Sequence, residues 1–179
     1  GCGMSGAEAA ERILYRNGLT NVRIEHISGN LTDHYDPSSK VLRLSDATYN
    51  ATSVAAVGVA AHECGHAVQD ARGYAPLKFR SALVPAANFG SKFGLPIFVL
   101  GLFLGSNELL MKIGIWVFLA AVLFQIVTLP VEFDASHRAM GFLTEYGILS
   151  ENEAEGSRRV LRAAAMTYVA AAAAALLNL

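Results

Sequence analysis

One stretch of this chain limits its possible folds more than any other. Residues 113–131 are nineteen positions without a charged side chain, and Gln125 and Thr128 are the main polar ones. As an α-helix this run would be roughly 28 Å long, close to the hydrocarbon thickness of a bilayer. Trp116 lies near one end, where interfacial aromatic residues are common. We expect this run to cross a membrane rather than fill a soluble core.

The composition fits a chain divided between water and lipid. Of its 179 residues, 53% are hydrophobic and 16% are charged, and the mean hydropathy is +0.37. Soluble domains carry about 25% charged residues. Because 14 Lys and Arg residues balance 15 Asp and Glu residues, there is no basic excess and we expect no nucleic-acid partner. The abundant apolar surface also excludes a disordered chain.

Two further apolar segments accompany the first. Between Ser81 and Ser106 the only charged residue is Lys92, and residues 163–179 are uncharged and rich in alanine. We therefore predict a transmembrane helical hairpin that turns at 105–109, followed later by a C-terminal apolar helix whose small residues suit helix packing.

The charges predict on which side of the membrane the hairpin ends lie. Both outer ends of a hairpin share one side, and here they carry far more positive charge than the turn, which favours the cytoplasm. Two cysteines make no disulfide framework and agree with a reducing compartment. The basic residues on the side of the outer hairpin ends are Arg72, Lys78, Arg80, His137, Arg138, Arg158, Arg159 and Arg162.

The first eighty residues predict a small α+β fold. Ser5 followed by acidic residues is typical of a helix N-cap, and this first helix should end at Arg16, before Asn17-Gly18. A second, longer helix is expected over residues 53–70. Alternating apolar residues and a turn signature at Asp36-Pro37 predict a small antiparallel sheet. Its expected strands are 22–27, 31–35 and 40–44.

The second predicted helix contains a metal-binding pattern, His62-Glu63-Cys64-Gly65-His66. Histidines four residues apart lie on one helical face, so both rings can reach one ion. Glu63 is offset from them and can reach the position where water binds, which suits a general base. The plainer alternative is a pair of hydrogen-bonded core histidines. Cys64 points off the histidine face, and we interpret it as a small core residue.

A catalytic zinc ion needs three protein ligands and one open position. Glu132 directly follows the charge-free run, and a hairpin that returns to the same side would bring it near the first two ligands. The residues alone leave the third ligand open. The candidates are Glu132, Asp134, His137, Asp33, His34 and Asp36.

Six segments between about Met4 and the alanine-rich end share a distinctive pattern: residues 62–70, 73–77, 81–85, 88–90, 33–37 and 129–133. Together they resemble one family, the "putative neutral zinc metallopeptidases" of bacterial membranes (the YugP type). The resemblance implies a bacterial cell-membrane protein in which His62, His66 and Glu132 hold one zinc ion, as in the distantly related HtpX-like membrane gluzincins.

The resemblance also bears on residues behind the ligands. In those relatives an acidic or amide residue four positions after the glutamate supports a ligand histidine, and here that position is Ser136. Asp70 is a further candidate for orienting a histidine, although a polar residue near a helix end is its plainer role. Members usually begin with an apolar helix ahead of the segment that matches Met4, and because none precedes Met4 here, we expect the native start of the chain to be missing.

Taken together, the sequence predicts a membrane-embedded zinc metalloendopeptidase that acts on protein or peptide substrates, expected to be membrane-associated. Zinc would activate water and polarise the scissile carbonyl, while Glu63 takes the proton. The oxyanion needs a donor, for which Arg138, His137, Tyr146 and Tyr35 stay open, and Arg138 is equally explained as a juxtamembrane charge. The alternative function is an inactive membrane scaffold or chaperone-like adaptor that retains the site, but such a protein would not need Glu63. A structural zinc site would need a fourth ligand nearby.

The expected fold class is α+β and mostly α, with a zincin-like active-site helix, a small antiparallel sheet, a transmembrane hairpin and a C-terminal apolar helix. The expected divisions are 1–80 for the zincin-like part, 81–131 for the hairpin, 132–162 for the third-ligand helix and cytoplasmic connection, and 163–179 for the apolar helix.

Overall fold

The computed structural model describes residues 3–177. Most of the chain is helical and one small sheet is present in this range, which confirms the α+β, mostly α class. The elements are α1 (Gly6–Arg16), β1 (Arg23–Ile27), β2 (His34–Asp36), β3 (Val41–Ser45), α2 (Asp46–Tyr49), α3 (Val54–Ala71), α4 (Ala75–Phe103), α5 (Glu108–Glu145) and α6 (Glu151–Leu177).

The chain forms two compact units. The first unit contains the residues up to Tyr74 together with Val131–Met166, and the second contains Ala75–Pro130 and the residues from Thr167 onwards. Two helices, α5 and α6, therefore contribute to both units. The predicted four-part division is a different partition of the same chain and stays a prediction.

Local signals start the helices of the first unit. The Ser5 hydroxyl accepts a hydrogen bond from the Glu8 amide, and the Glu8 carboxylate accepts one from the Ser5 amide, both at 3.2 Å. This capping box satisfies two amides that the first turn of α1 cannot. The Ser53 hydroxyl caps α3 in the same way, accepting from the Ala56 amide at 3.1 Å. Both helices therefore begin where the sequence predicts.

The core of the first unit forms around α3. Its small and apolar residues are almost fully buried and pack with α1, the sheet and the second half of α5. Alanines at the contacts allow the backbones to approach closely, which keeps α3 fixed between its neighbours. The fully buried members include Ala9, Ala10, Ile13, Leu42, Leu44, Val57, Ala60, Cys64, Ala139 and Leu143.

The sheet is mixed, with strand order β1-β3-β2. β2 and β3 pair antiparallel, with Tyr35 opposite Leu42, as the predicted hairpin requires. The expectation of a purely antiparallel sheet is wrong, because β1 pairs parallel with β3, Ile24 opposite Leu42. The connection over residues 28–33 is long enough to carry the chain past β3, so β2 forms the other edge. This connection includes Leu31, which has a φ of 60°. As a result β2 begins at His34, three residues later than predicted.

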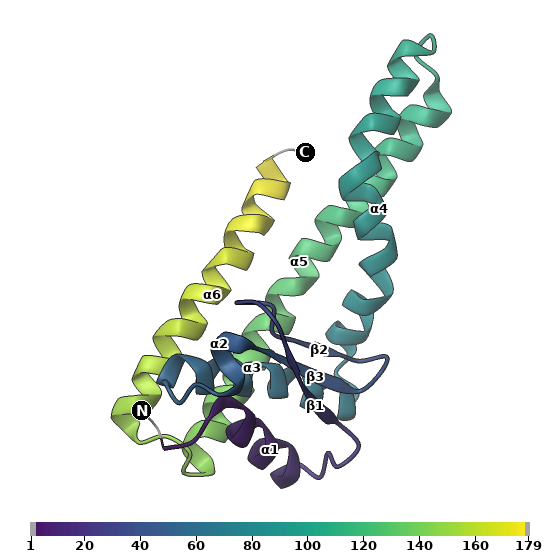
Figure 1. Ribbon diagram of the computed structural model, residues 1–179. Helices are drawn as coiled ribbons and strands as arrows, with labels where there is room; N and C mark the ends of the chain where they lie inside the picture. Colours follow the sequence, from purple (N-terminus) through teal and green to yellow (C-terminus); the bar gives the residue numbers. More distant parts are fainter. Residues whose placement is uncertain (1–2, 178–179) are drawn as a thin grey trace. The chain divides into compact units, whose positions relative to one another are not determined.

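Three helices, α4, α5 and α6, are long and apolar enough to cross a membrane. In the second unit α4 and the first part of α5 run side by side (Figure 1), and glycines form their contact. A Cβ atom built on Gly90 would lie 2.1 Å from the Val117 carbonyl oxygen, and one on Gly114 would lie 2.6 Å from that of Gly94. Such close helix packing through small residues is typical of membrane helices.

The third-ligand helix and the second hairpin helix are one element. α5 runs without interruption for 38 residues and includes Pro130. Glu132 therefore lies on the same helix as the charge-free run, two residues after that proline.

Candidate metal centre

The helix α3 carries His62, Glu63 and His66. The two histidines lie one turn apart, with ring centroids 4.8 Å from each other and planes at 86°. His66 is buried, whereas His62 and Glu63 are partly accessible. This arrangement places both imidazoles on one face of a helix that the core holds in place.

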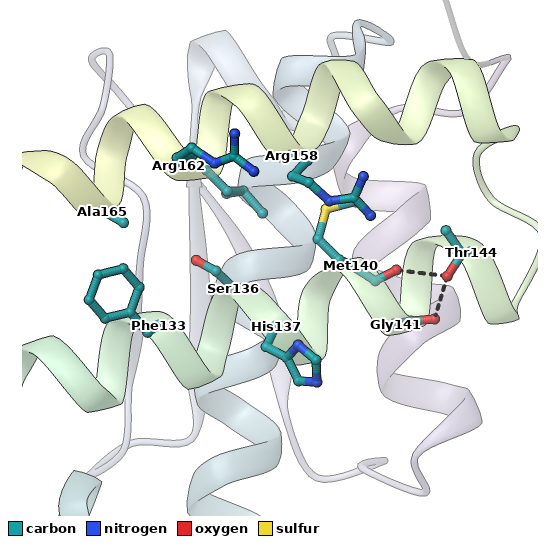
Figure 2. Close-up of a pocket in the computed structure, with 10 residues that line it drawn as sticks. Phe133, Ser136, His137, Met140, Gly141, Thr144, Arg158, Arg162 and Ala165 are labelled. Carbon is teal, nitrogen blue, oxygen red and sulfur yellow. Dashed lines mark hydrogen bonds between the residues drawn. The ribbon is translucent and has the colours of Figure 1, made fainter.

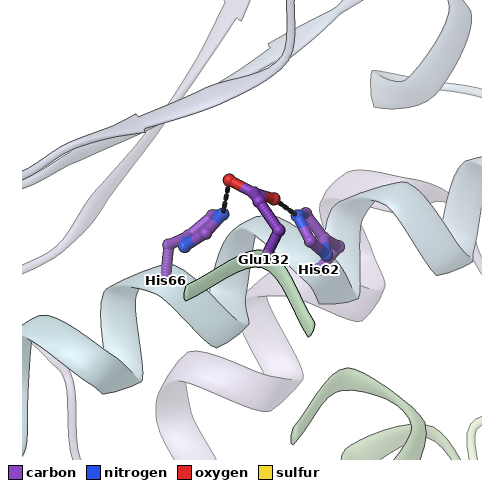
Figure 3. Close-up of side chains that lie close together, drawn as sticks. All are labelled: His62, His66 and Glu132. Atoms are coloured by element: carbon purple, nitrogen blue, oxygen red, sulfur yellow. Dashed lines mark hydrogen bonds and ion pairs between the residues drawn. The ribbon is translucent and has the colours of Figure 1, made fainter. Parts of the chain in front are cut away.

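Glu132, on α5, faces both histidines. Its Oε2 atom is 2.7 Å from His62 Nε2, and its Oε1 atom is 3.3 Å from His66 Nε2. The glutamate is only 4% exposed although it is charged. Figure 3 shows the carboxylate lying between the two rings. One potential ligand atom from each residue lies within 4.8 Å of the others.

A close contact between α3 and α5 positions this group. A Cβ atom on Gly65 would lie 2.5 Å from the carbonyl oxygen of Ala135, so only glycine permits the observed approach. Ala135 is itself completely buried. Because Glu132 is one turn before Ala135 on α5, the contact brings its carboxylate to the histidines of α3.

The outer nitrogen of each imidazole has a hydrogen-bond partner. His62 Nδ1 is 2.9 Å from the Ser136 hydroxyl, and His66 Nδ1 is 2.9 Å from Gln69 Oε1. The Gln69 amide nitrogen donates to the Val131 carbonyl and to Asp134, each at 2.9 Å. Its oxygen is therefore the atom that meets His66, so His66 Nδ1 must donate and the Nε2 lone pair is left toward Glu132.

Gln69 is a site residue that the sequence analysis missed. Its side chain is completely buried and connects His66 to α5. The available signal was a polar residue three positions after the second histidine, on the same helical face. In the sequence this residue is no different from any other polar residue near a helix end.

The candidates that the sequence offered for supporting the histidines have different contacts in the structure. Ser136, the position that corresponds to the supporting residue of the relatives, contacts His62. Asp70 accepts hydrogen bonds from the Tyr35 hydroxyl and from Lys40, and Gln69 is the residue that meets His66. Arg138 donates to Asp134 at 2.7 Å and lies over the Tyr74 ring.

Two of the remaining third-ligand candidates, Asp33 and Asp36, accept hydrogen bonds from serines elsewhere. Asp33 accepts hydrogen bonds from the amide and hydroxyl of Ser45, and Asp36 accepts from Ser38 and Ser39 in the turn after β2. The hydroxyls of Ser39 and Ser38 lower the pKa of Asp36 below its usual range. Within residues 3–177, the group that could hold a metal ion is His62, His66 and Glu132.

Cys64 is buried against α1, with its sulfur 3.7 Å from the Ala10 carbonyl oxygen. Burial, and then the charge of Glu63, raise the pKa of its thiol well above the ordinary value. A thiol that stays protonated is a poor metal ligand. This placement agrees with the interpretation of Cys64 as a core residue.

The donor set fits a zinc ion. Two imidazole nitrogens and one carboxylate oxygen are the ligands of several catalytic zinc sites, at about 2.0–2.2 Å from the ion. The ring nitrogens of His62 and His66 lie 2.7 and 3.3 Å from the two carboxylate oxygens of Glu132, and one potential ligand atom from each residue lies within 4.8 Å of the others, so all three residues can reach a single ion. Three protein donors leave a fourth position for water or substrate.

Comparison with known proteins agrees with this chemistry. The sequence profile of the family described as "Putative neutral zinc metallopeptidase" matches residues 1–179. The chain is also 48% identical over 177 residues to the "Putative membrane protease YugP" of Bacillus subtilis (strain 168), covering 99% of this chain and 78% of that protein. No solved structure matches the chain. By the extent of these matches, the chain belongs to the family of "putative neutral zinc metallopeptidases".

Proposed function

We propose that this protein is a membrane-embedded, zinc-dependent metalloendopeptidase. The observation that carries the proposal is the group of His62, His66 and Glu132, in which His66 and Glu132 are buried and the Nδ1 atom of each histidine is hydrogen-bonded. Anchored histidines present their other nitrogens to one point and lose little freedom when a metal binds. Family membership supports the same activity.

The chain's own residues supply orientation and proton transfer. Bound zinc would polarise the scissile carbonyl and lower the pKa of water. Glu63, next to His62 on α3, accepts a proton from the attacking water and returns it to the leaving amine. Ser136 and Gln69 hold the two imidazoles at a fixed rotation.

We propose that an extended peptide docks at the edge strand β2. This strand is at one edge of the sheet, and Tyr35 links it to α3 through its hydrogen bond to Asp70, at 2.6 Å. A peptide that pairs with β2 would add a strand to the sheet and run beside the helix that carries the two histidines. We propose membrane-associated proteins or peptides as the substrate class, because the chain combines this site with apolar helices.

The ligand assignment is tested by measuring zinc and proteolysis together. Glu132→Ala should lose both, because one of only three protein donors is removed. His137→Ala is a control on the same helix and should keep zinc. Asp134→Ala removes one contact of Gln69 but no proposed ligand, so it should lose less zinc than Glu132→Ala. The measurements are metal content by mass spectrometry and cleavage of labelled casein by the detergent-purified chain. If Glu132→Ala keeps its zinc and either of the other two variants loses it, the third ligand is wrong.

Glu63→Gln tests the general base separately. The amide cannot accept a proton, so cleavage should fall by about 100-fold or more, while zinc content stays unchanged. Retained cleavage would exclude Glu63 as the base. An unchanged chain that holds zinc but cleaves no substrate would instead favour the inactive scaffold that retains the metal.

We also propose that the active site is on the cytoplasmic side. This can be tested in cells that express a Cys2→Ser variant, in which Cys64 is buried, by adding one new cysteine at a time. A cysteine at Ser106, in the α4–α5 connection, should react with a membrane-impermeant maleimide added outside, and one at Ser150 should not. The reverse pattern would place the site outside.

A further inference from the structure

A groove of about 430 Å³ lies between α5 and α6 within the first unit. Figure 2 shows that residues of both helices line it, with Phe133 and Ala165 at one end and Thr144 near the other. Phe133, Ala165, Leu161 and Met140 give it apolar walls. Neither the metal centre nor the proposed peptide edge uses this space.

The same groove carries positive charge. Arg158 and Arg162 are four residues apart on α6, so both side chains lie along one helical face. Arg158 forms an exposed ion pair with Glu155 at 2.7 Å, which is a weak interaction. In the part of the chain that the structure describes, Arg162 has no carboxylate partner. His137 and Ser136 add polar atoms on the α5 side.

The groove is apolar at one end and more polar toward the other. This gradient follows the order of the lining residues along α5 and α6. Its apolar end, at Phe133 and Ala165, is where α5 has just left the charge-free run and where α6 enters its uncharged segment. Arg158 and Thr144 lie further from these apolar runs along their helices. An occupant therefore meets hydrocarbon-like walls toward the apolar segments and guanidinium groups beyond them.

We propose that this groove binds the phosphate headgroup of an anionic membrane phospholipid. The guanidinium groups of Arg158 and Arg162 bind the phosphate oxygens, and the upper acyl chain follows Phe133 and Ala165. Basic pockets between helices at the cytoplasmic border of a membrane suit such headgroups. The volume accommodates a headgroup and the first part of its chains, whereas free phosphate would leave the apolar walls unused.

The groove and the metal centre share one residue. Ser136 lines the groove and is also the partner of His62 Nδ1. A bound headgroup would therefore lie directly behind a candidate metal ligand. The inference does not rest on the proposed protease activity, because headgroup binding can be measured without any substrate.

The test is lipid binding to the full chain purified in a neutral maltoside detergent, counted by native mass spectrometry. Phosphatidylglycerol should bind as a single saturable adduct, about tenfold more tightly than phosphatidylcholine. Arg162→Gln removes the unpaired guanidinium and should weaken phosphatidylglycerol binding by about tenfold. Gly141→Glu should do the same, because a Cβ atom there meets open space and the new carboxylate enters the groove.

The matched control is Arg159→Gln. Arg159 is an exposed neighbour on α6 that does not line the groove, so this variant removes the same charge and should bind phosphatidylglycerol like the unchanged chain. Equal binding of the two lipids would overturn the proposal. An equal loss in Arg159→Gln would also overturn it, since the effect would then be general charge. Displacement of the lipid by millimolar inorganic phosphate would assign the groove to free phosphate instead.

Discussion

The hydrogen bonds of Gln69 lead to a sharp prediction about metal affinity. Replacing it by leucine keeps a buried side chain of similar size but removes the acceptor that orients His66. The His66 ring can then rotate and can carry its proton on Nε2, the nitrogen that faces Glu132. Both changes weaken the site without touching a proposed ligand.

The expected size follows from the contacts. Losing the partner of a ligand histidine typically costs about 10–100-fold in metal affinity, or about 1.4–2.7 kcal/mol. Leucine also removes the hydrogen bonds that the Gln69 amide donates to Val131 and Asp134. The resulting loss in the free energy of unfolding is near the low end of the usual 1–3 kcal/mol for each of these two groups, or about 2 kcal/mol in total. The reason is that Val131 keeps its helical hydrogen bond and Asp134 keeps Arg138.

Gln69→Glu separates metal orientation from packing. A carboxylate still accepts from His66 Nδ1, but it meets the Val131 carbonyl and the Asp134 carboxylate instead of donating to them. The glutamate variant should therefore be less stable than the unchanged chain, while its folded fraction binds zinc nearly normally. The leucine variant should lose affinity even where it is fully folded.

The assay is competition for zinc with a chromophoric chelator, on purified protein whose folded fraction is measured in parallel. Gln125→Leu provides the matched control, since Gln125 is the other glutamine of the chain and lies in the charge-free run. Its zinc affinity should be unchanged. A folded Gln69→Leu protein with the zinc affinity of the unchanged chain would refute the reasoning about His66.

Three further predictions concern stability. Gly65→Ala should lower the melting temperature and the zinc content together, because its Cβ atom would lie 2.5 Å from the facing α5 carbonyl, whereas Gly141→Ala, which meets open space, should be neutral or slightly stabilising. Gly90→Val should reduce the fraction of chain that remains monodisperse on heating in detergent, and Ala86→Val, at an exposed position on the same helix, should not. Burial, followed by its hydrogen bond to an aspartate, raises the pKa of Tyr35 above its usual value near 10. The unfolded chain thus ionises first, and stability should fall above about pH 10 more steeply in the unchanged chain than in Tyr35→Phe, in melts measured across pH.

Features with local causes could be predicted from the sequence. The start of α1 depends on Ser5 and Glu8, three residues apart, and the start of α3 on Ser53. The hairpin turn needs positive φ at Gly105 and also at Ser106, beside an unbroken apolar run. Each of these signals lies within a few residues of the structure that it determines, so no knowledge of distant neighbours is required.

The sheet and the support of the histidines could not be predicted in this way. Whether β1 pairs parallel or antiparallel with β3 depends on where residues 28–33 carry the chain, which no alternation of apolar residues records. The role of Gln69 depends on Val131 and Asp134, more than sixty residues away. A buried polar residue is identified by its partners, and these are known only once the helices are packed.

The geometry of the candidate metal centre thus depends on the contact between two helices more than on the motif itself. The histidines are fixed by their spacing on α3, but Glu132 reaches them only because Gly65 lets α5 approach. The same helix contains Pro130. Proline lacks the amide that would bond one turn back, so α5 has one weakened point, two residues before Glu132. Bending of α5 at that point would move Glu132 relative to the charge-free run that precedes it on the same helix. The hydrogen bonds from Gln69 to Val131 and Asp134, on either side of Glu132, oppose that movement and couple the carboxylate to His66.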